Sequence, residues 1–258
     1  MPPAVNRPAE EVDPMLRSEG LTKRYGRHTV VDDLTFECAA GEVLGFLGPN
    51  GAGKSTTMKM VTGFVEPSAG TASICGHDIR SDALAARRRL GYLPEGAPLY
   101  AEMTPGSFLQ FIADVRGLAG DTRRRRLDEV IGRLQLGPVL GQSIDTLSKG
   151  FKRRVGLAQA ILHDPDVLIL DEPTDGLDPN QKHEVRALIR SMSKDKLIVI
   201  STHILEEVDA VCTRAMIIAG GRLLVDDTPQ ALAEQGGGSL DALFRQVTSG
   251  AAPAEDAA

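Results

Sequence analysis

The stretch GPNGAGKST, residues 48–56, decides the fold of this chain. It has the form G-x-x-x-x-G-K-[ST], in which the glycines let the backbone turn tightly and bring its amides close to a phosphate. Lys54 supplies a positive charge for the β- and γ-phosphates, and the Ser55 hydroxyl is a ligand for Mg²⁺. A chance glycine-rich turn would match this form in roughly one chain of this size in a hundred. The stretch therefore predicts a nucleoside triphosphate site.

The sequence on either side of the loop supports this prediction. Residues 43–47, VLGFL, predict a short buried strand, and residues 56–61 predict a helix that ends near Gly63. A loop between a strand and a helix N-terminus favours a bound anion, because the helix dipole and the free amides both attract it. The predicted nucleotide-binding residues of the loop are Gly48, Pro49, Asn50, Gly51, Ala52, Gly53, Lys54, Ser55 and Thr56.

Composition narrows the class of protein. The 258 residues carry a formal net charge of −6, which lacks the basic character expected of a nucleic-acid-binding protein. The longest aliphatic runs, residues 167–170 and 197–200, are strand-sized and fall short of the ~20 apolar residues of a membrane-spanning helix. Three scattered cysteines favour reduced thiols in the cytosol over disulfides or zinc ligands.

The chain predicts one domain over residues 15–248 between two loose tails, residues 1–14 and 249–258. Residues 16–36 and 70–78 contain short β-prone pieces and predict an antiparallel sheet. Residues 104–141 are helical and charged, and the four arginines at 123–126 predict a solvated helix face. Strands and helices alternate from residue 167, which predicts a mainly parallel sheet with helices on its faces, an α/β fold.

The acids that a phosphate loop requires follow the apolar residues 167–170. Asp171 is placed to bind Mg²⁺ through a water molecule, and Glu172 to act as the general base that polarises the attacking water. Two acids after a strand are by themselves most often a solvated strand end. Because they lie downstream of the phosphate loop, the functional interpretation is favoured here.

A histidine follows the next predicted strand. His203 comes directly after residues 197–202 and opens a helix. A lone histidine is more often structural than catalytic. Parallel α/β sheets, however, bind their ligands at the carboxyl ends of the strands, where this residue lies. We therefore expect His203 to donate to the γ-phosphate or to orient the water.

Taken together, these motifs resemble the nucleotide-binding subunit of an ATP-binding cassette (ABC) transporter over about residues 16–247. The resemblance implies a P-loop NTPase fold with a mainly parallel sheet, an antiparallel β subdomain and a helical subdomain at about residues 96–150. It also implies that Tyr25 stacks on adenine, that residues 175–178 are the D-loop, ending in Asp178, and that His203 is the switch histidine.

The signature of that family, ideally LSGGQ, is LSKGF at residues 147–151. Ser148 and the Gly150 amide lie where a helix N-terminus could meet an anion. An ordinary helix cap with serine at the cap position is the alternative. Lys149 and Phe151 depart from the pattern, and Phe151 cannot hydrogen-bond a ribose.

A further departure is Glu95, in YLPE at residues 92–95, where the family's lid glutamine is expected. A carboxylate can still bind Mg²⁺, so the predicted metal ligands are Ser55, Glu95 and Asp171. Chains with YLPE and LSKG resemble ATPases of ABC-2-type exporters, including those named for gliding motility.

The resemblance implies two copies packed head-to-tail, with each ATP between Lys54 of one and Ser148 of the other. It implies ATP and Mg²⁺ as cofactors, a separate ABC-2-type membrane permease as partner, and peripheral attachment to the cytoplasmic face of the membrane. A homodimer is expected, with a heterodimer left open. Residues 95–141 would form the groove for a cytoplasmic helix of the permease, or else the core of the helical insert; the apolar candidates there are Pro98, Leu99, Tyr100 and Met103.

Two other classes compete with this interpretation. A cassette ATPase that acts on ribosomes usually carries two cassettes, and one that acts on DNA carries long inserts that residues 63–146 cannot hold. A kinase with the same loop would leave residues 147–151 and His203 without a role. The transported cargo is not encoded in any of these motifs.

Overall fold

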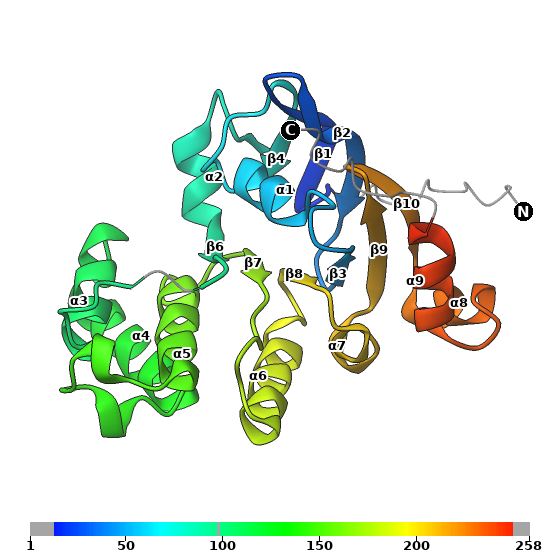
Figure 1. Ribbon diagram of the computed structural model, residues 1–258. Coiled ribbons are helices and arrows are strands. Elements are labelled where there is room, and N and C mark those ends of the chain that lie inside the picture. The colour runs from blue at the N-terminus through cyan, green and yellow to red at the C-terminus, as the bar shows by residue number, and fades with distance from the viewer. Residues whose placement is uncertain (1–12, 97–98, 250–258) are drawn as a thin grey trace, which may run out of the picture.

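The chain folds into two β-sheets with helices between and beside them, and the computed structural model describes residues 13–96 and 99–249 (Figure 1). Most of each predicted tail, residues 1–12 and 250–258, lies outside the described residues, as does Pro98. The α/β architecture agrees with the predicted fold class.

The first sheet is antiparallel, as predicted, with the strand order β2-β1-β4-β5. Its strands are β1 (Leu16–Tyr25), β2 (His28–Cys38), β4 (Ala69–Ile74) and β5 (His77–Asp78). The sequence suggested short pieces, whereas β1 and β2 have 10 and 11 residues. Shifts in the register between these two strands interrupt the alternation of buried and exposed residues, which explains the difference.

The second sheet has six strands in the order β10-β9-β3-β8-β7-β6, and only the pair β9–β10 is antiparallel. Strands β3, β7 and β8 are buried along their whole length, because both faces of the sheet are covered. This explains the continuous apolar runs in the sequence. The strands are β3 (Val43–Leu47), β6 (Leu90–Leu93), β7 (Val167–Asp171), β8 (Leu197–Thr202), β9 (Arg214–Ala219) and β10 (Arg222–Asp227).

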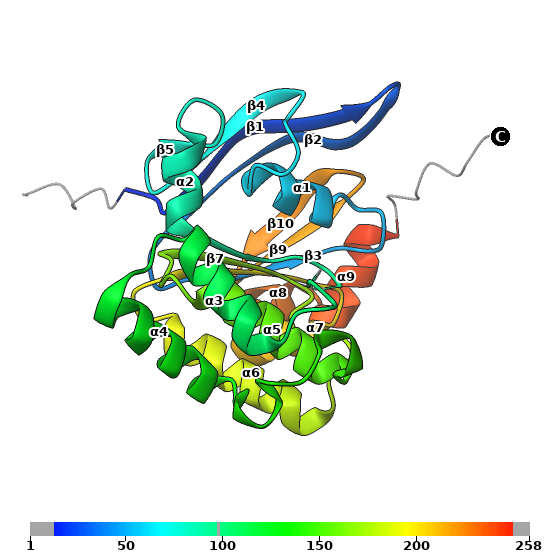
Figure 2. The same cartoon turned by 90° about the vertical axis from the view of Figure 1, so that its left-hand side faces the viewer.

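Helix α1 (Lys54–Val61) lies between the two sheets, as Figure 2 shows from the side. It begins two residues before the predicted helix, at the lysine of the phosphate loop. Alternate residues of β7 and β8 face two cores. Ile169 and Val199 pack in the core that includes Met58 of α1, and Leu168 and Ile198 pack in the core of the opposite face.

The remaining helices cover the opposite face of the second sheet, flank the antiparallel sheet or lie along the edge formed by β9 and β10 (Figures 1 and 2). Helix α5 (Lys149–Ile161) begins directly after its N-cap Ser148, so the last three signature residues form its first turn. The helices are α2 (Ala83–Arg89), α3 (Pro105–Val115), α4 (Gly120–Arg133), α5 (Lys149–Ile161), α6 (Pro179–Met192), α7 (Leu205–Val211), α8 (Pro229–Gln235) and α9 (Leu240–Thr248), with short 3₁₀ turns at Gly137–Val139 and Ile144–Thr146.

The arginine run of α4 is only partly the solvated face that the sequence predicted. Arg124 and Arg125 are exposed, but the Arg126 side chain is only 12% exposed. Its guanidinium donates to the carbonyl oxygens of Ile161 and Leu162 at the C-terminal end of α5, at 2.7 and 3.0 Å. A cation is favourable at that end of a helix because the free carbonyls point toward it. The prediction was therefore wrong for Arg126.

Candidate functional site

The loop between β3 and α1 borders a cavity of about 340 Å³. Glu95, which follows β6, and Glu172, which follows β7, also line this cavity, together with Val30 of β2. These acids meet the loop because parallel strands end at the same edge of the sheet. The loop residues that line the cavity are Asn50, Gly51, Ala52, Gly53, Lys54, Ser55 and Thr56.

Two glycines of the loop are required by close approaches of the backbone. Gly53 has φ of +100°, and a Cβ atom there would lie 2.7 Å from the carbonyl oxygen of Val30. A Cβ atom at Gly48 would lie 2.5 Å from the carbonyl oxygen of Ile218 in β9. No side chain fits either position without moving a neighbouring strand, so the loop conformation depends on these residues.

Lys54 is the first residue of α1 and is only 6% exposed. Its ammonium group donates to the carbonyl oxygens of Gly48 and Pro49, at 2.6 and 3.0 Å. Burial lowers the pKa of Lys54, and the nearby carboxylates, Glu172 foremost, act in the opposite direction. The positive charge is thus held over the loop at a helix N-terminus, an arrangement that attracts an anion.

Asp171 ends β7 and is only 1% exposed. One carboxylate oxygen accepts a hydrogen bond from the Ser201 hydroxyl at 2.6 Å, while Oδ2 is buried with no partner among the described residues. A buried acceptor without a partner is unfavourable, and a cation or its water shell would satisfy it. Hard oxygen ligands of this kind fit Mg²⁺.

The carboxylates and histidines of residues 13–96 and 99–249 form no group of three or more that could hold a metal alone. A cation at this site would therefore also need oxygens from a hydroxyl, a phosphate or water. The Ser55 hydroxyl lies in the loop beside Lys54 and supplies one such oxygen. The donors present thus fit a magnesium ion that arrives with a nucleotide.

Glu172 and His203 are in direct contact. The distance from Glu172 Oε1 to His203 Nδ1 is 2.7 Å, and the backbone amide of Glu172 donates to the carbonyl oxygen of Ser201 at 2.9 Å. Glu172 has φ of +50°, a left-handed conformation that is uncommon outside glycine. A carboxylate held by an imidazole at the edge of a phosphate cavity can accept a proton from water.

Glu207 is a buried residue that sequence reasoning missed. Its carboxylate accepts hydrogen bonds from the hydroxyls of Thr174, in the loop after Glu172, and of Thr202, at 3.2 Å for the latter. Glu207 therefore links the loop after Glu172, the predicted base, to Thr202, the residue before His203. In the sequence it is one of two adjacent glutamates in the first turn of α7, where acids are common, so no signal distinguished it.

The signature residues lie outside this cavity. Ser148 caps α5, and its hydroxyl accepts from the amide of Phe151 at 3.3 Å. A Cβ atom at Gly150 would lie 2.5 Å from Gln181 of α6, so α5 and α6 approach closely here. Arg154 lies over the Phe151 ring, 5.6 Å from its centroid. Phe151 thus packs within its own chain.

Asp178 and Tyr25 also lie outside the cavity lining. Asp178 caps α6, where its carboxylate accepts from the amide of Gln181 at 2.9 Å. Tyr25 ends β1 and is about half exposed, with the Lys23 ammonium 5.0 Å from its ring centroid. The structure therefore brings together the loop, Glu95 and Glu172, with Asp171 and His203 beside them, and it leaves Tyr25, Ser148, Gly150 and Asp178 outside this group.

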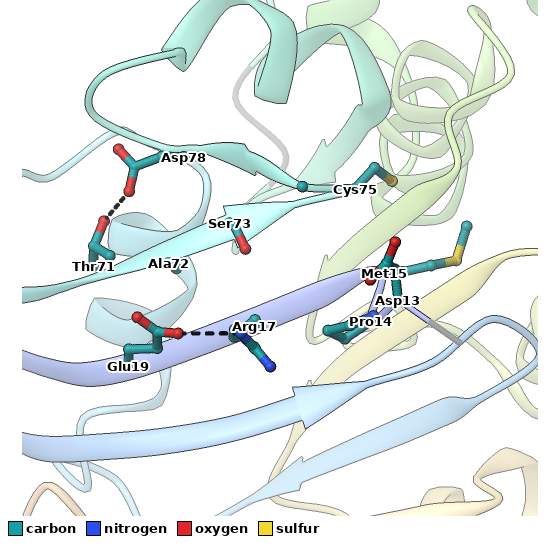
Figure 3. Close-up of a pocket in the computed structure, with 11 residues that line it drawn as sticks. Asp13, Pro14, Met15, Arg17, Glu19, Thr71, Ala72, Ser73, Cys75 and Asp78 are labelled. Carbon is teal, nitrogen blue, oxygen red and sulfur yellow. Dashed lines mark hydrogen bonds and ion pairs between the residues drawn. The ribbon is translucent and has the colours of Figure 1, made fainter. Parts of the chain in front are cut away.

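A larger hollow of about 570 Å³ lies on the antiparallel sheet, along β1 and β4 (Figure 3). It contains no predicted site residue, and four of its polar side chains form two pairs within the hollow. The Thr71 hydroxyl donates to Asp78 at 2.6 Å, which, with the amide of Ser81, lowers the pKa of Asp78 to about 2. Arg17 pairs with Glu19 at 3.5 Å. We therefore place the candidate site at the phosphate loop.

Comparison with known proteins points to one family. A family model described as "ABC transporter" matches residues 31–175. The chain is 39% identical over 220 residues to the Nod factor export ATP-binding protein I of Ralstonia nicotianae, covering 85% of this chain and 68% of the relative. It is 36% identical over 222 residues to the probable multidrug ABC transporter ATP-binding protein YbhF of Escherichia coli, covering 86% of this chain and 38% of that protein.

A solved structure described as an ATP-binding subunit of an ABC transporter has the same fold. It superposes with a TM-score of 0.84 at 33% identity, covering 90% of this chain and 99% of the other. The two chains therefore share nearly their whole architecture.

Proposed function

Because this chain belongs to the ABC transporter family, we propose that two copies pair head-to-tail around two ATP molecules and drive a separate membrane permease, as part of an exporter. The chain is the ATP-binding, ATP-hydrolysing subunit of such a transporter. One observation carries the proposal. The phosphate loop, Glu95 and Glu172 share one cavity, whereas Ser148 is exposed at the end of a different helix, where a second copy could be reached.

The residues of the cavity divide the chemistry among them. The loop amides and Lys54 hold the phosphates, and Glu172 takes a proton from the water whose oxygen attacks the γ-phosphorus while the bond to ADP breaks. His203 holds the Glu172 carboxylate in place. Mg²⁺ would be held by Ser55, Glu95 and, through water, by Asp171, and it would supply positive charge that offsets the charge of the phosphates.

Tyr25→Ala should raise the KM for ATP about tenfold and leave kcat close to that of the parent, because the adenine loses its stacking partner. Tyr25→Phe is the matched control, since it keeps the ring and should keep the parent KM. Steady-state phosphate release over a range of ATP concentrations measures both. An unchanged KM in Tyr25→Ala would remove this residue from the nucleotide site.

Ser148→Arg should reduce ATP hydrolysis about 100-fold while each subunit still binds nucleotide, because the arginine blocks the surface that faces the partner's phosphates. The matched control is Gln142→Arg, which places the same side chain at an exposed position shortly before Ser148 in the chain. Turnover and the affinity for a fluorescent ATP analogue are measured on both variants. Parent-like turnover in Ser148→Arg would contradict a shared nucleotide site.

An aromatic surface near α3 supports the proposed permease contact. Tyr100 is 59% exposed, and its ring centroid lies 6.0 Å from that of Phe108 and 5.8 Å from that of Phe111. Leu99 and Met103 instead pack against the helical core. Tyr100 and Phe111 could therefore receive an apolar cytoplasmic helix. Within residues 13–96 and 99–249, no helix is long and apolar enough to cross a bilayer.

Export, and a permease of the ABC-2 type, are inferred from the named relatives, one described for Nod factor export and one as probably for multidrug transport. Such a partner would hold the ATPase at the cytoplasmic face of the membrane. Capture of the tagged chain from detergent extracts, followed by identification of the co-purified membrane protein, tests this. Recovery of ribosomes or DNA in place of a membrane protein would favour the competing class.

A further inference from the structure

Arg153 lies in α5, the helix that begins with the signature residues, and it contacts the chain at the ends of β6 and β7. The residue is only 6% exposed. Its guanidinium donates to four backbone carbonyl oxygens, of which those of Pro94 and Pro173 lie at 3.2 Å. The other two acceptors belong to Asp171 and Glu172. One side chain thus contacts the residue before Glu95 and the whole turn that follows β7.

This turn is the one that directs the Glu172 carboxylate. Glu172 has a left-handed backbone (φ +50°), which is unfavourable for a residue with a Cβ atom unless its surroundings hold it. Buried carbonyl groups also need donors. Arg153 supplies these donors at three consecutive residues, and from this backbone Glu172 reaches His203 at 2.7 Å.

The same guanidinium lies among the acids of the site. Burial lowers the pKa of Arg153, and the carboxylates of Asp175, Asp171, Glu172 and Glu95 act against this effect. A guanidinium stays charged in proteins, so it reduces the repulsion among these acids. Its planar fork of donors can serve several carbonyls at once, whereas the ammonium of a lysine is a point charge.

We propose that Arg153 is a positioning residue for hydrolysis, which fixes the turn at Asp171 and Glu172 relative to the helix that begins after Ser148. A movement of α5 would then be transmitted to the catalytic turn and to the residue before Glu95. Arg153 would govern the rate of hydrolysis and leave nucleotide affinity unaffected. The inference rests on the proposed role of Glu172 as the general base.

The test uses Arg153→Ala and Arg153→Lys in the purified full chain. We expect kcat for ATP to fall about 100-fold in both variants, as for a catalytic group displaced by about 1 Å, with KM and the affinity for a fluorescent ATP analogue unchanged. Added methylguanidinium should restore part of the kcat of Arg153→Ala, because it can occupy the vacated space and serve the same carbonyls.

Arg126→Ala is the matched control, since Arg126 is also a largely buried arginine that donates to backbone carbonyls of α5, away from the cavity. It should keep the parent kcat and should not respond to methylguanidinium. Thermal melting establishes whether each variant is folded. If Arg153→Ala does not fold, the conclusion is drawn from Arg153→Lys.

The inference would be overturned if Arg153→Lys kept the parent kcat, or if its kcat/KM fell only because KM rose. The behaviour of Glu172→Gln separates this outcome from failure of the proposed function. If Glu172→Gln is inactive while Arg153→Lys turns over at the parent rate, only the role of Arg153 is wrong. If Glu172→Gln is fully active, the proposed base is wrong.

Discussion

Lys54→Ala is expected to hydrolyse ATP at less than about one-hundredth of the parent rate, which is the loss typical of removing one fixed electrostatic partner of the reacting group. Lys54 is buried at the N-terminus of α1, and its ammonium is held over the loop by Gly48 and Pro49. Without it, the β- and γ-phosphates lose their fixed cation. Phosphate release at saturating ATP and the affinity for a fluorescent ATP analogue measure the effect.

Lys59→Ala is the matched control for this variant. Lys59 lies in the last turn of the same helix and is exposed, so its removal changes the charge of the chain equally without touching the cavity. It should hydrolyse ATP at the parent rate. Parent-like turnover in Lys54→Ala would show that the phosphate site lies elsewhere.

Glu172→Gln should retain ATP binding and lose about 10²–10⁴-fold in kcat, because only the acceptor for the proton of the attacking water is removed. Glutamine keeps the volume of the side chain and can still bond to His203. Single-turnover hydrolysis with pre-bound ATP separates the chemical step from binding.

Glu206→Gln provides the comparison, since Glu206 is an exposed acid in the first turn of α7. It should be as active as the parent. Hydrolysis by Glu172→Gln at the parent rate would count against Glu172 as the base.

The elements that could be predicted from the sequence are those in which every residue has the same surroundings. Strands β3, β7 and β8 are buried on both faces, so their apolar runs were sufficient. Edge strand β10, with the sequence RLLVDD, has no fully buried residue and no alternation of apolar and polar residues, and it was not predicted. Helix α8 has only seven residues and one buried position, too few for a periodic pattern.

The residues of the site, like the strands and helices, divide into those that the sequence could predict and those that it could not. Residues of the phosphate loop are contiguous, and their positions follow from a local motif. Arg153 and Glu207 contact partners that are distant in the sequence, such as Pro94 for Arg153. A charge run or a helix start gives no indication of such partners, because tertiary packing decides them.

The proposed head-to-tail pair is tested most directly by the mass of Glu172→Gln in solution. Light scattering coupled to gel filtration should give the monomer mass of 27.5 kDa without nucleotide and twice that mass with Mg²⁺ and ATP. The added variant Ser148→Arg on the same chain should restore the monomer. A mass of 27.5 kDa for Glu172→Gln at saturating ATP, with the nucleotide bound, would contradict the shared site.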